Sequence, residues 1–103
     1  MEDDDRVAAI ARALAHPARV RIVRLLAAQS ECRGADVFSE LPLAQSTISE
    51  HLRVLKGAGV VSSRPEGTGM VYCLTSGAFE DFISLVSGFA AATPACVSEG
   101  KGC

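Results

Sequence analysis

The feature that most constrains the fold is an amphipathic segment that runs directly into a hairpin pattern. From Leu43 to Gly59 the apolar residues recur at helical spacing, and Gly59 supplies a stop of the kind that ends helices. The stripe is formed by Leu43, Ile48, Leu52 and Leu55. Beyond it, residues 60–64 and 70–74 read as two short strands, and the Pro- and Gly-containing stretch 65–69 predicts the turn between them.

Further helical patterns lie on both sides of this unit. Helices are expected over about residues 3–15 and from Pro17, which suits a first helical turn, to about residue 28. A short helical stretch is expected over 35–40, and a last helix over about 76–91. The last helix is expected to turn its apolar residues inward: Phe79, Phe82, Ile83, Val86 and Phe89. This order predicts a mainly α winged helix-turn-helix fold with a small β-hairpin wing.

Length and composition fit one such domain. The chain has 103 residues, 49% of them hydrophobic, and a second independent core would not fit in that length. We expect residues 1–92 to form the domain and residues 93–103 to be a flexible, Cys-containing tail. The apolar runs are far shorter than a membrane span, and the acidic start is unlike a signal peptide. A cytoplasmic protein without a membrane partner is therefore expected.

The exposed face of the segment 43–59 has the composition of a DNA-reading helix. Short hydroxyl and amide side chains can approach base edges, and basic side chains can hold phosphate. Bases also outnumber acids between Arg6 and Arg64, although the whole chain has a net charge of −2. The residues expected to contact DNA are Gln45, Ser46, Thr47, Ser49, Glu50, His51, Arg53, Lys56 and Arg64. The alternative is an ordinary solvent-exposed helix, which usually carries more Lys and Glu.

On these residues the chain resembles the ArsR family of metal-sensing winged-helix repressors. The resemblance is carried by five runs: Leu14 to Ile22, Leu43 to Leu55, Ala58 to Val61, Arg64 to Gly67 and Tyr72 to Leu74. Within the second run, the motif Gln-Ser-Thr-Ile-Ser-x-His-Leu is specific for this family. The resemblance implies a homodimer joined through the first and last helices, which binds double-stranded operator DNA with dyad symmetry and releases it when an inducer binds. Those two helices also look more apolar than a monomer could cover.

The four cysteines bear on the inducer, and without an export signal they are expected to be reduced thiols. In many family members that sense arsenite or antimonite, two cysteines separated by one residue precede the recognition helix. Cys32 matches one variant of that pattern, and the second cysteine is missing. We expect Cys32, Cys96 and Cys103 to bind arsenite or antimonite, with zinc or cadmium as other possible ions and Cys73 as a fourth candidate ligand. A pair of Cys32 and Cys73 is the alternative site.

Other functions stay open on the sequence. Two cysteines could instead form a disulfide or polysulfide bridge in a redox- or sulfide-sensing repressor of the same fold. A small metal carrier without DNA binding is a third hypothesis. An enzyme is not expected, because neither histidine has a cysteine near it in sequence and no Cys-x-x-Cys or Gly-rich phosphate loop is present. His16 is expected to cap or pack a helix, and His51 to contact phosphate or pack.

Overall fold

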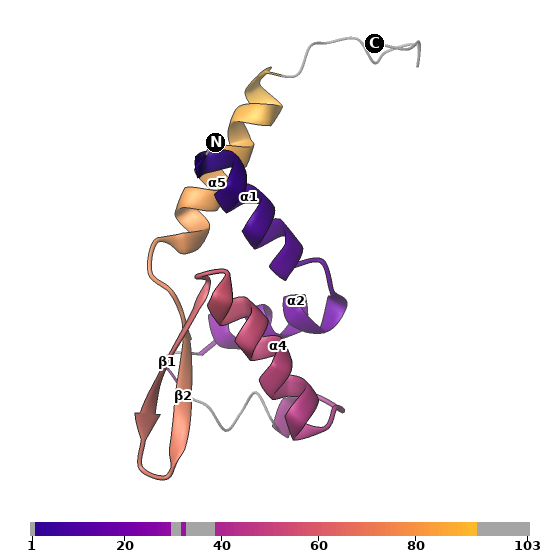
Figure 1. The fold of residues 1–103 in the computed structure, drawn as a ribbon, viewed down its shortest axis with the longest axis vertical. Coiled ribbons are helices and arrows are strands. Elements are labelled where there is room, and N and C mark those ends of the chain that lie inside the picture. The colour runs from indigo at the N-terminus through magenta and orange to yellow at the C-terminus, as the bar shows by residue number, and fades with distance from the viewer. Residues whose placement is uncertain (1, 30–31, 33–38, 93–103) are drawn as a thin grey trace.

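The computed structural model describes residues 2–29, 32 and 39–92. Its elements are α1 (Glu2–Ala13), α2 (Pro17–Ala27), α4 (Gln45–Gly57), β1 (Val61–Glu66), β2 (Gly69–Leu74) and α5 (Ala78–Ala92). Figure 1 shows α1 and α5 side by side at one end of the molecule, with the turn of the hairpin and the N-terminal end of α4 at the other end. The expected winged helix-turn-helix fold is confirmed. The short helix expected over 35–40 lies mostly outside the described residues.

The boundary between α1 and α2 is set by two neighbouring residues. His16 has an extended backbone, and its Nδ1 accepts a hydrogen bond from the backbone N–H of Ala18 at 3.1 Å. Pro17 follows in the first helical position, where its fixed φ suits the helix and its missing N–H removes no internal bond. The capping role expected for His16 is therefore confirmed.

The wing is a two-stranded antiparallel hairpin with a tight turn. Val61 is paired with Leu74 at its base and Glu66 with Gly69 at its tip, so only Gly67 and Thr68 form the turn. Gly67 has a φ of +61°, which a two-residue hairpin turn needs at its first position and which other residues rarely adopt. The structure thus shortens the expected turn over 65–69, because cross-strand pairing extends through Pro65 and Glu66.

The core lies where the helices meet the base of the hairpin. Its buried side chains come from α1, α2, α4, the residue before β1 and the first residue of β1: Ile10, Ala13, Ile22, Leu26, Ile48, Leu52, Leu55, Val60 and Val61. Within α4 these buried positions follow the 3.6-residue helical period, so one face of the helix is fixed and the opposite face is left to solvent. That division determines which α4 side chains are accessible.

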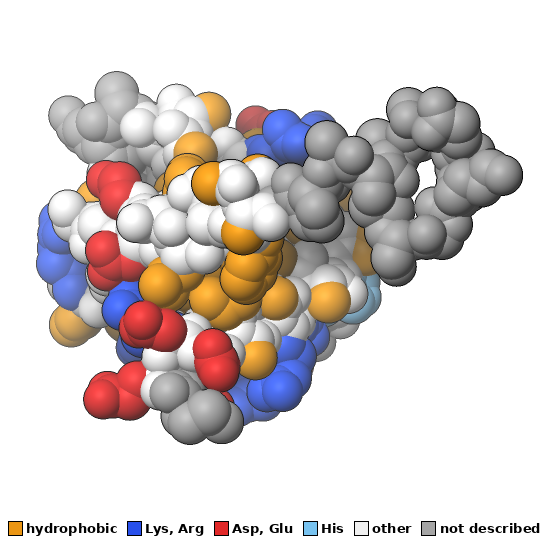
Figure 2. All heavy atoms as spheres, turned by 90° about the horizontal axis from the view of Figure 1, so that it is seen from above, with side chains coloured by type: hydrophobic (Ala, Val, Ile, Leu, Met, Phe, Trp, Pro, Cys, Tyr) orange, Lys and Arg blue, Asp and Glu red, His pale blue; other side chains and the backbone are white. Residues whose placement is uncertain are grey.

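Only part of α5 packs inward. Phe79 and Phe82 pack against the core, whereas Ile83 is 60% exposed and Phe89 is 65% exposed. The inward placement expected for Ile83 and Phe89 is therefore wrong for the single chain. Ile83 follows Phe82 directly and so lies on a different side of the helix, whereas Phe89 belongs to the later turns of α5, which continues past the core (Figure 1). Figure 2, which views the molecule from the α1 and α5 end, shows hydrophobic side chains gathered on this face beside acidic ones.

Candidate nucleic-acid interface

The exposed face of α4 is polar throughout. Burial of Ile48, Leu52 and Leu55 fixes the rotation of the helix about its axis. The opposite face carries the exposed residues Gln45, Ser46, Thr47, Ser49, Glu50, Arg53 and Lys56. Hydroxyl and amide groups are grouped in the first turns, and basic groups follow toward the C-terminal end. This is a surface of donors and acceptors on a rigid rod, which matches what a major groove presents.

One ion pair lies within this face. Arg53 donates to the Glu50 carboxylate through Nε at 3.0 Å, and its NH2 nitrogen contacts the same oxygen. The hydrogen bond from Arg53 lowers the pKa of Glu50, and the same bond raises the pKa of Arg53. Both groups are exposed, so the pair is open to solvent and to an incoming phosphate. A phosphate must compete with Glu50 for the guanidinium.

The wing carries a second exposed pair. Arg64 on β1 contacts Glu66 with an N to O distance of 3.4 Å, and both side chains are about three-fifths exposed. The turn that follows lies at the same end of the molecule as the N-terminal end of α4 (Figure 1). The wing therefore adds an exposed cation, Arg64, to the polar groups that are exposed on α4.

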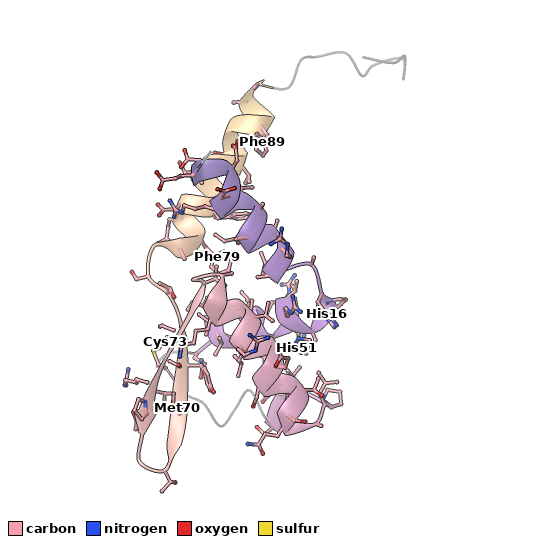
Figure 3. All side chains as sticks on the ribbon, in the orientation of Figure 1. His16, His51, Met70, Cys73, Phe79 and Phe89 are labelled. Carbon is pink, nitrogen blue, oxygen red and sulfur yellow. A yellow bond between two sulfur atoms is a disulfide. The ribbon has the colours of Figure 1, made fainter. Side chains whose placement is uncertain are left out.

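His51 differs from the other residues expected to contact DNA. It is buried, at 9% exposure, and its ring lies 4.6 Å from the ring of His16, centroid to centroid. Its Nδ1 accepts a hydrogen bond from Nε of Arg19 at 3.3 Å. Figure 3 shows the two histidines facing each other from α4 and from the start of α2. The structure thus places His51 on the inner face, and a direct DNA contact is not available to it in this conformation.

The position of His51 has a signal in the sequence. It lies three residues after Ile48 and four before Leu55, which is the spacing of the buried stripe of α4. Burial, followed by the charges of His16 and Arg19, lowers the pKa of His51. A neutral imidazole with an acceptor nitrogen suits the guanidinium that contacts it.

The cysteines are placed only in part. Cys32 and Cys73 form a disulfide, with their Cα atoms 5.0 Å apart and a separation of 41 positions in sequence. Free thiols were expected at both positions, so the structure differs, because it brings Cys32 next to Cys73 of β2. Cys96 and Cys103 lie outside the described residues. Among the residues that are described, no three His, Cys, Asp or Glu side chains are gathered where they could hold a metal ion.

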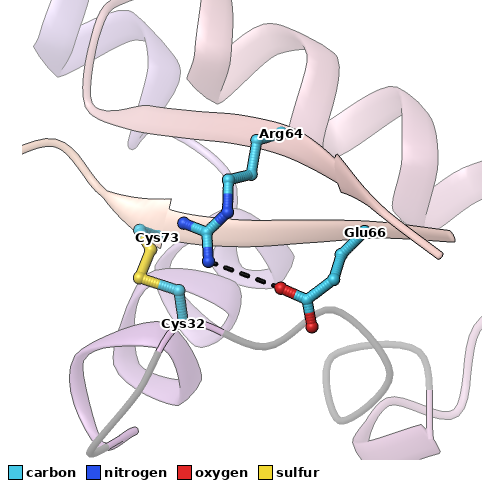
Figure 4. The surroundings of a disulfide bond; sticks show 4 residues. All are labelled: Cys32, Arg64, Glu66 and Cys73. Carbon is cyan, nitrogen blue, oxygen red and sulfur yellow. Dashed lines mark hydrogen bonds and ion pairs between the residues drawn. A yellow bond between two sulfur atoms is a disulfide. The ribbon is translucent and has the colours of Figure 1, made fainter.

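The disulfide lies beside the wing pair. Cys73 is paired with Ser62 in the hairpin register, and alternation along β1 puts Arg64 and Glu66 on the same face as Ser62. Figure 4 shows the bridge with Arg64 and Glu66 beside it. Cys32 and Cys73 are the alternative site expected from the sequence, but the spacing of the cysteines does not indicate a bridge between them, because residues 41 positions apart are brought together only by the fold.

Comparison with known proteins assigns the chain to a family. Residues 16–63 match the family described as bacterial regulatory protein, arsR family. A helix-turn-helix transcriptional regulator of Methanocaldococcus jannaschii is 37% identical over 86 residues, which is 84% of this chain and 97% of that protein. The chain belongs to the ArsR family. Its relatives are DNA-binding transcriptional regulators, so this ArsR-family protein is a regulator of transcription and not an enzyme.

A second relative matches a shorter part of the chain. The cadmium resistance transcriptional regulatory protein homologue of Staphylococcus aureus is 35% identical over 66% of this chain, which is 56% of that protein. The chain likewise spans 57% of the length of a Mycobacterium tuberculosis regulator that is 40% identical. It thus covers little more than half of several of its curated relatives.

Solved structures share the fold. An ArsR-like transcriptional regulator from Rhodococcus superposes with a TM-score of 0.75, covering 88% of this chain and 85% of that one at 21% identity. A homodimeric winged helix-turn-helix DNA-binding domain from Mycobacterium bovis superposes with a TM-score of 0.67 at 31% identity, covering 84% of this chain and 80% of that one. In the described part of this ArsR-family chain, no helix has the length and apolar character that a membrane crossing needs.

Proposed function

We propose that this protein is a homodimeric repressor whose α4 enters the major groove of operator DNA while the wing contacts the backbone. One observation carries the proposal: the whole exposed face of α4 is polar, and the wing, which carries the exposed Arg64, has its turn at the same end of the molecule as the N-terminal end of α4 (Figure 1). In this mode the second helix of the helix-turn-helix unit reads base edges with its first turns. Gln45 suits adenine, and Ser46, Thr47 and Ser49 suit phosphate or base edges.

The basic side chains have a separate role. Arg53, Lys56 and Arg64 are exposed and neutralise phosphates, which supplies affinity without sequence information. Glu50 is part of the exposed face and holds Arg53 in the free protein. Because DNA must displace that carboxylate from Arg53, Glu50 penalises binding at any site where it finds no donor of its own.

A dimer is proposed through α1 and α5. Ile83 and Phe89 are exposed on α5, and hydrophobic side chains gather at this end of the molecule (Figure 2). The end with α1 and α5 is opposite the wing turn (Figure 1), so a two-fold axis there leaves both α4 helices free. The homodimeric state of the M. bovis domain supports the assignment. Two α4 helices about 34 Å apart then match half-sites one DNA turn apart.

The first candidate signal is a soft metal(loid). Thiolates of Cys32, Cys96 and Cys103, with Cys73 as a fourth candidate, suit arsenite or antimonite and also zinc or cadmium. The printed name of the S. aureus relative, a cadmium resistance regulator, supports a metal signal. This site requires reduced Cys32, since a sulfur held in the bridge to Cys73 has no thiolate to offer. By reciprocity, operator DNA weakens binding of such an inducer by the factor with which the inducer weakens binding of DNA.

A second candidate signal is thiol oxidation or a reactive sulfur species. The Cys32–Cys73 bridge favours it, because two of the four thiols lie within bonding distance in the folded chain. This candidate needs no metal ion and no residue beyond position 92.

A mobility-shift titration tests the proposal and separates the signals. The full chain is reduced, bound to a duplex from its own promoter and titrated with arsenite, antimonite, zinc or cadmium, then separately with hydrogen peroxide. Release by an ion that is lost in Cys32→Ser, Cys96→Ser and Cys103→Ser supports the metal(loid) site. A response to peroxide alone supports the sulfur signal. Absence of any preference for the promoter duplex at low ionic strength contradicts the repressor itself.

A further inference from the structure

We infer that the Cys32–Cys73 pair is a reversible oxidation site, and that the bridged state holds the wing in the position that binds DNA. The inference rests on the proposed operator binding and names its regulation. It starts from where the bridge is attached: one end is in β2, and the other is in the connection between α2 and α4. The bridge therefore ties the wing to Cys32, a residue between α2 and α4.

The wing is anchored only near its base. Val61 and Val71 are buried and Tyr72 packs against the core, whereas every residue from Arg64 to Met70 is exposed. Cys73 lies at the anchored end, directly across from Ser62. Among the described residues, the bridge is the covalent tie that holds the hairpin to another element besides its own two ends. Without the bridge, the exposed half of the hairpin is held to the rest of the chain only by side-chain packing at its base.

The face that the bridge holds is the one with the wing cation. Arg64 shares this face with Cys73, and Figure 4 shows its guanidinium beside the bridge. A wing that is fixed before binding loses less conformational entropy when Arg64 binds a phosphate, and this preorganisation increases the affinity for DNA. Opening the bridge therefore weakens operator binding while α4 keeps its buried stripe and its exposed polar face.

A peroxide can form the bridge from the two thiols, and a dithiol reductant can open it again. Hydrogen peroxide oxidises one thiolate to a sulfenic acid with release of hydroxide, and the second thiolate displaces hydroxide from that sulfur as the S–S bond forms. Two thiols and one peroxide thus give one disulfide and two waters. A dithiol reductant reverses the reaction, since its thiolate attacks one sulfur, the other leaves as a thiolate, and the reductant ends as its own disulfide.

The test measures DNA affinity in both redox states of the full chain. Fluorescence anisotropy with the promoter duplex is run at one fixed salt concentration after peroxide and after dithiothreitol, and mass spectrometry reports the two hydrogens gained on reduction. We expect the reduced protein to bind about tenfold more weakly. Cys32→Ser and Cys73→Ser are expected to bind like the reduced wild type under both conditions. Circular dichroism of the reduced wild type shows that its helices are retained.

The matched control is Ser62→Ala, which changes the residue across the hairpin from Cys73 and keeps both thiols. It is expected to show the full tenfold response. Equal affinity of the oxidised and reduced wild type, or tighter binding after reduction, overturns the inference and leaves the DNA-binding proposal standing. A response that persists in the double variant Cys32→Ser/Cys73→Ser also overturns it, because other thiols would then be responsible. Absence of duplex binding in both redox states overturns the repressor proposal together with it.

Discussion

Nδ1 of His51 in α4 accepts a hydrogen bond from Nε of Arg19 in α2 at 3.3 Å, beneath the face that we propose reads DNA. The same arginine donates through its NH1 nitrogen to the backbone carbonyl of Arg12 at 3.4 Å, so α1, α2 and α4 meet at one side chain. The ring of His16 covers His51 from the start of α2. A buried neutral histidine thus fixes how α4 sits on its support.

This contact predicts a pH dependence of stability. Burial is the main cause that lowers the pKa of His51 below its ordinary value of 6.5, and the charges of His16 and Arg19 add to it against the opposing effect of Glu50. The unfolded chain therefore takes up this proton at a higher pH than the folded one. The stability that His51 contributes is present above the ordinary value and is lost as the pH falls through the folded pKa.

Urea unfolding at a series of pH values from about 8 to about 5 measures this loss. Carboxylates begin to titrate at the lower end of the range, so the informative quantity is the difference between the wild type and His51→Gln. That difference is expected to shrink as the pH falls. Parallel curves for the two proteins would show that the protonation of His51 is not linked to folding.

The ion pair on α4 predicts opposite effects of its two partners on DNA binding. Glu50→Gln removes the carboxylate that competes for Arg53, and it is expected to raise the affinity for a promoter duplex by up to about tenfold at low salt. Arg53→Gln is expected to lower it and to reduce the salt slope of log K by about one for each subunit. Fluorescence anisotropy across a salt series measures both. The control is Arg24→Gln, an exposed arginine of α2, and a change as large as that in Arg53→Gln would contradict the assignment.

The exposed end of α5 predicts the effect of a charge on assembly. Phe89→Asp places a carboxylate on the proposed dimer surface, where desolvation opposes burial, and sedimentation velocity is expected to show a shift from dimer to monomer. Operator affinity falls with it, because one half-site remains in contact. Met70→Gln alters another exposed apolar residue, at the wing turn, and is expected to leave the assembly unchanged. A dimeric Phe89→Asp protein would place the interface elsewhere.

The bridge predicts a stability change that does not depend on DNA. It closes a loop between residues 41 positions apart, which restricts the unfolded chain, so reduction is expected to lower the free energy of unfolding by about 2–4 kcal/mol. Urea denaturation with and without dithiothreitol measures it. The double variant Cys32→Ser/Cys73→Ser serves as the control and should give the reduced value under both conditions. An unchanged midpoint for the wild type would mean that the bridge constrains neither state.

Local patterns were sufficient for the order of the elements. The stripe of Leu43, Ile48, Leu52 and Leu55 predicted α4 together with its exposed face, although Leu43 lies before the helix and is 40% exposed. The two short strands expected around the stretch 65–69 predicted the hairpin. Such short-range patterns are enough to predict these elements, because each helix and the hairpin is formed by one continuous segment of the sequence. Pro17 was equally informative about where α2 begins, because the fixed φ of proline suits the first turn of a helix.

Tertiary placement was beyond the sequence in two ways. The partner of Cys32 depends on how the connection after α2 meets β2, and the spacing of the cysteines does not encode it. Phe89 has the apolar character of a core residue, yet its side chain is 65% exposed in the single chain. A pattern of apolar residues indicates that a face is to be buried, and it does not distinguish a core from an interface between subunits. The roles of Cys96 and Cys103 stay predictions.

The most direct test of the central claim compares the affinity of the full chain for its promoter duplex with its affinity for a duplex of scrambled sequence, at one salt concentration. The wild type is expected to prefer the promoter by about a thousandfold or more. Gln45→Ala, in the exposed first turn of α4, is expected to lose about 1–3 kcal/mol of that preference while its affinity for the scrambled duplex changes little. Equal binding of both duplexes by the wild type, or an unchanged preference in Gln45→Ala, would contradict readout of DNA sequence by this face.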